Sequence, residues 1–228
     1  MLSNKEIICP INLLDVAHKK KDIPAGIVNA GKMLPMLSVI DAVKENLINP
    51  ILIGDKDEIQ KCAKELQFDI SKYEIIHEPK ENSTAKIAAK LASEGKIKII
   101  VKGHIHTDVL MKEVIKKEYN LLGKTRLSHI WHMTLEKNDQ PIIITDGALN
   151  VSPNVKTKMH ILKNVINFCH RIGIEKPKVS VLSATEEVLD SVQSSIDAKE
   201  ITELAKKENL KADVFGPLAF DNSVSKKS

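Results

Sequence analysis

Short apolar runs alternate with helical stripes of apolar residues along most of the chain. Short apolar runs predict strands at 51–55, 73–76, 97–101, 141–145, 178–184 and 212–215, and a longer one at 126–135. Apolar positions spaced three or four apart predict helices over 36–48, 55–66, 87–95, 107–119, 152–173 and 197–204. The EKNDQ stretch between 135 and 141 is a turn, so its two flanking strands are expected to be neighbours.

Residues with side-chain oxygens stand where several of these helices should begin. Such oxygens accept the free backbone N–H groups of a first helical turn. The predicted caps are Asp55 with Glu58, Thr107, Ser152 followed by Pro153, and Asp197 with Glu200. Gly95 and Gly173 are expected to end the helices that precede them.

Alternating strands and helices predict an α/β protein with a mainly parallel sheet and helices on both faces. The length of 228 residues allows one large domain or two small ones. The polar turn at 136–140 gives the predicted boundary, with a first domain at 1–136 and a second at 137–228.

The composition argues against a membrane-spanning protein and against a nucleic-acid-binding protein. Hydrophobic residues make up 43% and charged residues 28%, as in ordinary globular proteins, and no apolar run is long enough to span a bilayer. The N-terminus does not have the pattern of a signal peptide. The net charge of +4 is spread over amphipathic segments and only 3% of residues are aromatic, so we expect no nucleic-acid partner. Three widely spaced cysteines without a CxxC pair fit a reducing cytoplasm.

The candidate site residues are those directly after the predicted strands, because open parallel sheets bind ligands beyond the carboxyl ends of their strands. The strongest local signal is KGHIHTD, which begins at Lys102. Lys102, Gly103 and a helix beginning near Thr107 could hold a phosphate on the first-turn amides, although Thr107 could equally be only a cap. Replacing Lys102 by Ala should then weaken phosphate binding without unfolding the chain.

Other strand-end residues are open to two interpretations. Asp146 could orient a base or a ligand hydroxyl, or simply form a turn with Gly147. Arg126 is one of two arginines and could bind phosphate with two hydrogen bonds, or be a surface charge. The His104/His106 and His129/His132 pairs are not completed by further ligands with zinc spacing, so no metal is expected.

Several stretches, in the same order, resemble the phosphate acetyltransferase and phosphate butyryltransferase family. They are VIDAVKENLINPILIGDKDEI, KGHIHTDVLMKEVI, RLSHI, the stretch from PIIITDGALN to VSVLSATEEV, and GPLAFDNSVS. The resemblance runs from about residue 25 to the end of the sequence. It implies reversible transfer of an acyl group between coenzyme A and inorganic phosphate, by direct attack of the CoA thiol on an acyl phosphate.

The resemblance also implies two α/β subdomains with the site in an interdomain cleft, and it implies the partners. Substrate-binding positions carried over from the family are Lys102, Gly103, Thr107, Arg126, Ser128, Asp146, Asn150, Ser183, Gly216, Pro217 and Asp221. Coenzyme A, acyl phosphate and phosphate are the expected ligands, with CoA acting as a substrate and no tightly bound cofactor. A homodimer is the expected assembly.

The sequence departs from the family pattern after GPLAFDN, where family members carry a Ser-Arg pair and an Asp implicated in CoA binding and base catalysis. No stretch here resembles that segment, so the catalytic residues are unassigned and a returning strand and helix of the first domain are unmatched. Phe215, His132 and the Ser191–Gln193 region also differ from the family pattern. We therefore expect the 228-residue chain alone to be a poor acyltransferase.

Three alternatives stay open. The chain could be a butyryltransferase, which no residue distinguishes from an acetyltransferase. It could be a non-catalytic remnant or interaction module, or one half of a split gene. The third alternative is a different acyltransferase or a decarboxylating dehydrogenase of related fold. The dehydrogenase should show a cluster of metal-binding aspartates on helices, and the sequence shows none.

Overall fold

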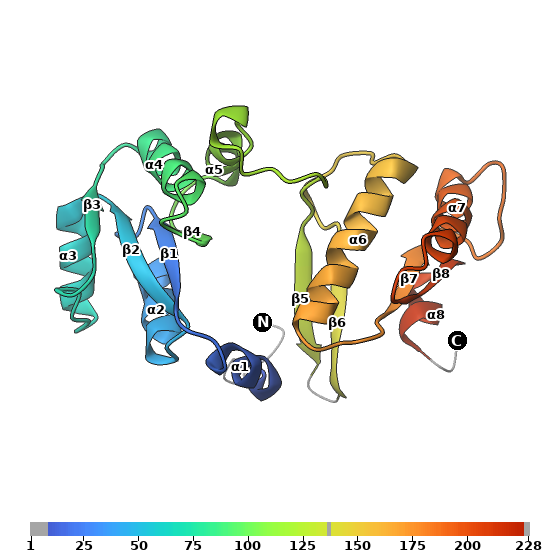
Figure 1. Cartoon of the computed structure of the whole chain (residues 1–228), viewed down its shortest axis with the longest axis horizontal. Coiled ribbons are helices and arrows are strands. Elements are labelled where there is room, and N and C mark those ends of the chain that lie inside the picture. Colours follow the sequence, from blue (N-terminus) through green and yellow to red (C-terminus); the bar gives the residue numbers. More distant parts are fainter. Residues whose placement is uncertain (1–8, 136–137, 226–228) are drawn as a thin grey trace. The chain divides into compact units, whose positions relative to one another are not determined.

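The computed structural model describes residues 9–135 and 138–225 and divides into two compact units, Met1–Gly123 and Lys124–Ser228. The first unit is drawn from blue to green in Figure 1, and the second from yellow-green to red. Among the described residues, no helix has both the length and the apolar character needed to cross a membrane.

The first unit is built on a four-stranded parallel sheet in the order β3-β2-β1-β4. Its strands are β1 (Ile23–Val28), β2 (Ile48–Gly54), β3 (Ile75–His77) and β4 (Ile99–Lys102). Three of them overlap predicted strands, but the central strand β1 was not predicted. Its sequence, IPAGIV, contains Pro24 and Gly26, which weaken any strand signal even though four of its six residues are buried.

Helices cover both faces of this sheet, which confirms the predicted fold class. The unit contains α1 (Ile11–His18), α2 (Met33–Lys44), α3 (Lys56–Glu65), α4 (Glu81–Ser93), α5 (Thr107–Val114) and the 3-10 turn η1 (Lys117–Tyr119). One core joins α2 and α3 to Ile27 and Leu52. A second core joins α4 and α5 to Val28 and Ile53, because successive strand residues point to opposite faces.

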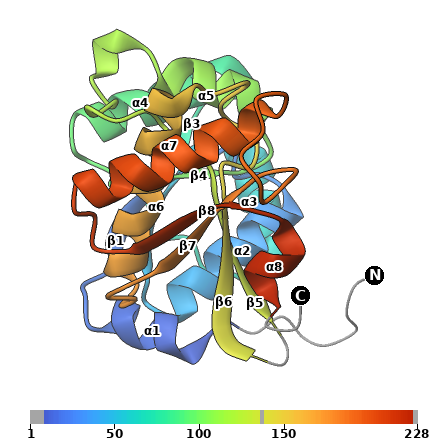
Figure 2. The same cartoon turned by 90° about the vertical axis from the view of Figure 1, so that its right-hand side faces the viewer.

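The second unit contains two two-stranded sheets. Its elements are β5 (Ile130–Leu135), β6 (Asn138–Thr145), α6 (Val155–Arg171), β7 (Lys178–Leu182), α7 (Gln193–Lys207), β8 (Asp213–Leu218) and α8 (Phe220–Val224). Strands β5 and β6 are antiparallel neighbours, as their short connection predicts, whereas β7 and β8 are parallel. Figure 2 faces this unit and shows α7 running along β7 and β8.

The core of the second unit lies between its two long helices and the parallel strand pair. The predicted stripe of α6, comprising Met159, Leu162, Ile166 and Cys169, is buried. Ile201 and Ala205 of α7 complete the buried cluster, and strand valines pack against it. The helical spacing in the sequence therefore identified the correct buried face of α6.

The division between the units falls at 123/124, whereas the sequence suggested 136/137. Residues 136–137 of the proposed turn lie outside the described residues. The physical reason for the difference is strand pairing: Ile130 pairs with Thr145, and Met133 with Ile142. A boundary inside this hairpin would separate two strands that hydrogen-bond to each other, so β5 belongs with β6.

Only one of the four predicted helix caps is correct. Asp55 caps α3, with its Oδ1 accepting from the N–H groups of Asp57 at 2.9 Å and Glu58 at 3.0 Å. At α6 the cap is Asn154 rather than Ser152, because Ser152 has a left-handed φ of 48° and the helix begins only after Asn154. Asp197 lies inside α7, which begins four residues earlier at Gln193.

Candidate functional site

The loop after β4 packs tightly against the end of β1. Gly103 is buried, its N–H donates to Val28 O at 2.9 Å, and a Cβ on Gly103 would lie 2.2 Å from that same oxygen. The side chain of Asn29 donates to His104 O. Glycine is therefore required for chain packing at this point, and the exposed side chain of Lys102 is held at the carboxyl edge of the sheet.

The start of α5 differs from the prediction in one respect. Thr107 is the first helical residue, and the cap position is occupied by His106, whose N–H donates to Glu81 Oε1 at 2.6 Å. A carboxylate thus already satisfies the amide just before the helix. Within the described residues, no acceptor is found for the N–H groups of residues 107–109, the amides proposed to hold a phosphate. The negative charge of Glu81 weakens anion binding at the N-terminus of α5.

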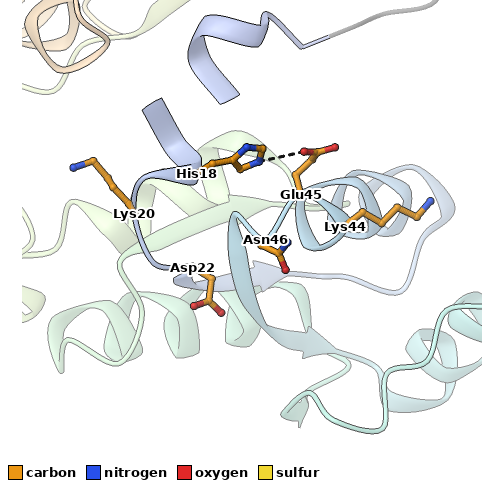
Figure 3. Close-up of a pocket in the computed structure, with 6 residues that line it drawn as sticks. All are labelled: His18, Lys20, Asp22, Lys44, Glu45 and Asn46. Carbon is orange, nitrogen blue, oxygen red and sulfur yellow. Dashed lines mark ion pairs between the residues drawn. The ribbon is translucent and has the colours of Figure 1, made fainter. Parts of the chain in front are cut away.

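A polar cavity of about 470 Å³ lies elsewhere in the first unit. It is lined by His18, Lys20, Asp22, Lys44, Glu45 and Asn46. Figure 3 shows His18 and Glu45 facing each other, with His18 Nε2 3.2 Å from Glu45 Oε2. Asp22 and Asn46 stand just before β1 and β2, so the cavity lies at the amino edge of the sheet, opposite Lys102. It contains none of the predicted site residues.

In the second unit, Asp146 connects the two ends of the β5–β6 hairpin. Its Oδ1 accepts the backbone N–H of His129 at 2.7 Å. Its Oδ2 accepts from Asn150 twice, from the backbone N–H at 2.9 Å and from Nδ2 at 2.5 Å. The same Nδ2 also donates to Leu127 O at 2.9 Å. Both carboxylate oxygens are therefore engaged by donors from the protein itself.

These donors decide the ionisation state of Asp146. Partial burial raises the pKa of its carboxyl, but the Asn150 side chain and the N–H groups of His129, Asn150 and Leu149 outweigh burial and hold the pKa below its usual value. A carboxylate with a lowered pKa and no free oxygen is a weak base. Asp146 is thus suited to fixing the loop rather than to taking a proton.

The segment before β5 is held by α6 as well. The N–H of Arg126 donates to His160 Nδ1 at 3.1 Å, and Asn164 Nδ2 donates to Arg126 O at 2.7 Å and to Ser128 Oγ at 3.0 Å. Four predicted residues, Arg126, Ser128, Asp146 and Asn150, consequently belong to one hydrogen-bonded region. Sequence reasoning missed His160 and Asn164, which lie on α6 between the apolar residues of the stripe.

The remaining predicted residues gather at the carboxyl ends of β7 and β8. Ser183 N donates to Leu218 O at 2.9 Å, and its hydroxyl lies 2.9 Å from Ser194 Oγ. A Cβ on Gly216 would lie 2.7 Å from Val181 O, and the Gly216–Pro217 peptide bond is cis. Asp221 follows on α8. The predicted strand ended at Phe215, whereas β8 runs to Leu218, so Gly216 and Pro217 lie within the strand and not in the loop after it. Parallel pairing of β7 with β8 brings Ser183 beside Leu218.

The structure places the eleven predicted residues in three groups. Lys102 ends β4 and is followed by Gly103 and Thr107, the Asp146 group surrounds the open end of the β5–β6 hairpin, and the third group lies near the carboxyl ends of β7 and β8 and on α8. These strands belong to three separate sheets. The sequence argument assumed that loops following strands of one parallel sheet would share a face, and the antiparallel hairpin breaks that assumption. A shared face stays a prediction.

Two departures from the family pattern have different surroundings. His132 packs its ring edge-on against Phe168 of α6, with ring centroids 6.4 Å apart, so it fills an apolar position on the hairpin. Phe215 is 62% exposed on β8. Within 9–135 and 138–225, no three His, Cys, Asp or Glu side chains are placed to hold a metal ion.

Comparison with known proteins links this arrangement to one family. Residues 76–228, which include all eleven predicted residues, match the model of the family described as phosphate acetyl/butaryl transferase. The chain is 36% identical over 217 residues to the phosphate acetyltransferase of Rickettsia typhi, covering 94% of this chain and 62% of that protein. It is 32% identical to the phosphate butyryltransferase of Clostridium acetobutylicum, covering 97% of this chain and 74% of that protein.

Solved structures agree with these matches. The crystal structure of a branched-chain phosphotransacylase from Enterococcus faecalis V583 aligns with a TM-score of 0.76 and 28% identity, over 90% of this chain and 71% of that one. A phosphotransacetylase from Streptococcus pyogenes has a TM-score of 0.74 at 17% identity, which supports the fold alone. This chain spans about 62% of the length of the Rickettsia relatives.

Proposed function

Because the chain belongs to the phosphate acetyl/butaryl transferase family, we propose that its protein transfers an acyl group reversibly between coenzyme A and inorganic phosphate. In the forward direction the CoA sulfur forms a bond to the carbonyl carbon of an acyl phosphate. The bond from that carbon to the bridging oxygen breaks, and phosphate leaves with the electron pair. The thiol proton passes to a base that is not assigned to a residue of this chain.

The observation that carries this proposal is the hydrogen-bonded region around Arg126 and Ser128. Family resemblance selected Arg126, Ser128, Asp146 and Asn150 from two segments about twenty residues apart. The contacts of Asp146 and Asn150 join these segments, which supports one site rather than scattered surface residues. An exposed arginine and a hydroxyl two residues apart suit the oxygens of an acyl phosphate.

Lys102 is the second proposed phosphate contact. It is an exposed cation at the carboxyl edge of the parallel sheet, beside the first-turn amides of α5. The negative charge of Glu81 disfavours an anion at the N-terminus of α5. We therefore assign the larger share of phosphate binding to the Arg126 region. Ser183, Gly216, Pro217 and Asp221 are proposed to contact the same substrates from the ends of β7 and β8.

Three finer features belong to the proposal. Coenzyme A acts as a substrate, and no cofactor is tightly bound. The protein forms a homodimer, which is supported by the outward apolar side chains of Trp131, Met133 and Ile144 on the hairpin, exposed by 55%, 37% and 38%. It works in the cytoplasm, in keeping with its free cysteines, two of which are buried.

The test is an assay of acyl-CoA formation by the complete product of the gene, with acetyl phosphate and butyryl phosphate compared. Replacing Arg126 by Ala should raise the KM for acyl phosphate about tenfold or more, because one charged hydrogen bond is lost. Arg171→Ala is the matched control: Arg171 is also exposed and lies in the last turn of α6. Absence of acyl-CoA with both substrates would favour the non-catalytic alternative.

A further inference from the structure

Asn164 has two acceptors from the segment before β5. Its Nδ2 lies 2.7 Å from Arg126 O and 3.0 Å from Ser128 Oγ. Asn164 stands in the middle of α6, and its neighbours Val165 and Ile166 are buried. The amide therefore projects from a helix that is anchored in the core of the second unit.

Chemistry fixes which way the Asn164 amide faces. A backbone carbonyl only accepts hydrogen bonds, so the group facing Arg126 O must be the NH₂. An amide NH₂ has two hydrogens and accepts none, so its second hydrogen points to Ser128 Oγ. Ser128 is consequently the acceptor in this contact, and its own proton is directed away from Asn164.

The proton of Ser128 has no acceptor within the part of the chain that the structure describes. Ser128 is only half-buried, so a ligand oxygen can reach it. A hydroxyl that accepts a hydrogen bond is a stronger donor, because hydrogen bonds in a chain polarise one another. Ser128 follows the exposed residues Arg126 and Leu127 in the chain. The Asn164 amide also donates to the backbone carbonyl of Arg126.

We propose that Asn164 is a positioning residue that holds the Ser128 hydroxyl as a hydrogen-bond donor to an oxygen of the acyl phosphate. This inference rests on the proposed function. Asn164 itself does not touch the substrate. It acts through Ser128, and its bond to Arg126 O fixes the amide so that the second hydrogen faces the Ser128 hydroxyl.

The sharpest variant is Asn164→Asp, which preserves size and shape but replaces the NH₂ by an acceptor. The carboxylate would take the Ser128 proton in a hydrogen bond and place a negative charge near the anionic substrate. Asn164→Leu removes the donor without adding charge. Asn167→Asp is the matched control, since Asn167 is exposed on the same helix and makes only a 3.4 Å contact with Arg171 one turn further along.

We expect Asn164→Leu to lower kcat/KM for acetyl phosphate about tenfold, and Asn164→Asp to lower it more, with the KM for CoA within about twofold of wild type. Asn167→Asp should behave as wild type. In the Ser128→Ala background, Asn164→Leu should have little additional effect, because Asn164 acts through the missing hydroxyl. Additive losses would show a purely structural role and overturn the proposal.

Binding of inorganic phosphate, followed by ³¹P NMR or calorimetry, separates the two proposals. If wild type forms no acyl-CoA but binds phosphate in a way that depends on Ser128 and Asn164, the function is wrong and the positioning role stands. If wild type is active and Asn164→Asp equals it in both assays, the positioning role is wrong and the function stands. The thermal midpoint of each variant shows whether it is folded. An Asn164 variant that does not fold is replaced by Asn164→Ser.

Discussion

The backbone N–H of His129 donates to Asp146 Oδ1 across 2.7 Å, just beyond the last residue pair of the β5–β6 hairpin. The same carboxylate holds Asn150, whose side chain reaches back to Leu127 O at 2.9 Å. The chain entering the hairpin and the chain leaving it are therefore fixed to one another by one carboxylate. These hydrogen bonds join the candidate segment before β5 to the candidate segment after β6.

Replacing Asp146 by Ala should reduce the free energy of unfolding by about 2–3 kcal/mol, because the partly buried donors of His129 and Asn150 lose their acceptor. Asp146→Asn should cost less, since its amide oxygen retains one acceptor. Urea unfolding followed by circular dichroism measures both. Two variants as stable as wild type would mean that this carboxylate does not fix the hairpin ends.

The lowered pKa of Asp146 predicts a direction for the pH dependence of stability. A carboxyl whose pKa is lower in the folded state than in the unfolded chain stabilises the fold above its ordinary value of about 3.8. That stabilisation is lost as pH falls through the lowered folded value. Between pH 6 and pH 3, wild type should lose more free energy of unfolding than Asp146→Asn, measured by urea unfolding at each pH. Parallel curves for the two proteins would contradict the assignment.

An ion pair joins the two long helices of the second unit. Lys158 Nζ on α6 lies 2.6 Å from Asp197 Oδ2 on α7, and Gln193 donates to the other oxygen at 2.7 Å. The hydrogen bond from Lys158 is the main cause of the lowered pKa of Asp197, opposed by burial and aided by Gln193. This contact explains why Asp197 sits inside α7 and does not cap it.

Lys158→Met should destabilise the protein by about 1–3 kcal/mol, because it leaves a nearly buried carboxylate without its cation. The Lys158→Met/Asp197→Leu double variant should recover part of that loss, since neither charge is then left alone. Thermal unfolding of these two variants and of Asp197→Leu completes a double-mutant cycle. Strictly additive effects would show that the two side chains do not interact.

Gly103→Ala should destabilise the first unit by about 2–3 kcal/mol, because the new Cβ would meet Val28 O at 2.2 Å and Asn29 O at 2.7 Å. Gly123→Ala is the control, since a Cβ there meets no atom within 4 Å. Equal thermal midpoints for both variants would mean that the loop after β4 does not pack as described. Hydrogen exchange of the Gly103 amide gives an independent measure of the same contact.

The sequence predicted those elements whose signal is local. Helical spacing identified the buried side of α6, and Asp55 was correctly recognised as the cap of α3. Strand β1 escaped because Pro24 and Gly26 interrupt an apolar run whose burial comes from neighbours on both sides. The caps at α6 and α7 were misplaced because Ser152 adopts a left-handed turn and Asp197 pairs with a lysine 39 positions away.

The candidate site also contains residues that the sequence indicated and residues that only the structure identified. Arg126, Ser128, Asp146 and Asn150 were selected by family resemblance, and no pattern in the sequence indicates that hydrogen bonds join them. Asn164 and His160 carry no motif, and each looks like an ordinary polar residue beside an apolar stripe. Only their contacts with Arg126 and Ser128 distinguish them, and such contacts depend on how α6 packs beside the segment before β5.

The central claim is acyl transfer between phosphate and coenzyme A, and exchange of labelled inorganic phosphate into acetyl phosphate tests it most directly. The complete gene product is incubated with acetyl phosphate, labelled phosphate and a small amount of CoA. The account predicts that label enters acetyl phosphate only when CoA is present, because acetyl-CoA is the intermediate through which phosphate is exchanged. No exchange with CoA would contradict the proposed function, and exchange without CoA would contradict direct attack of the thiol.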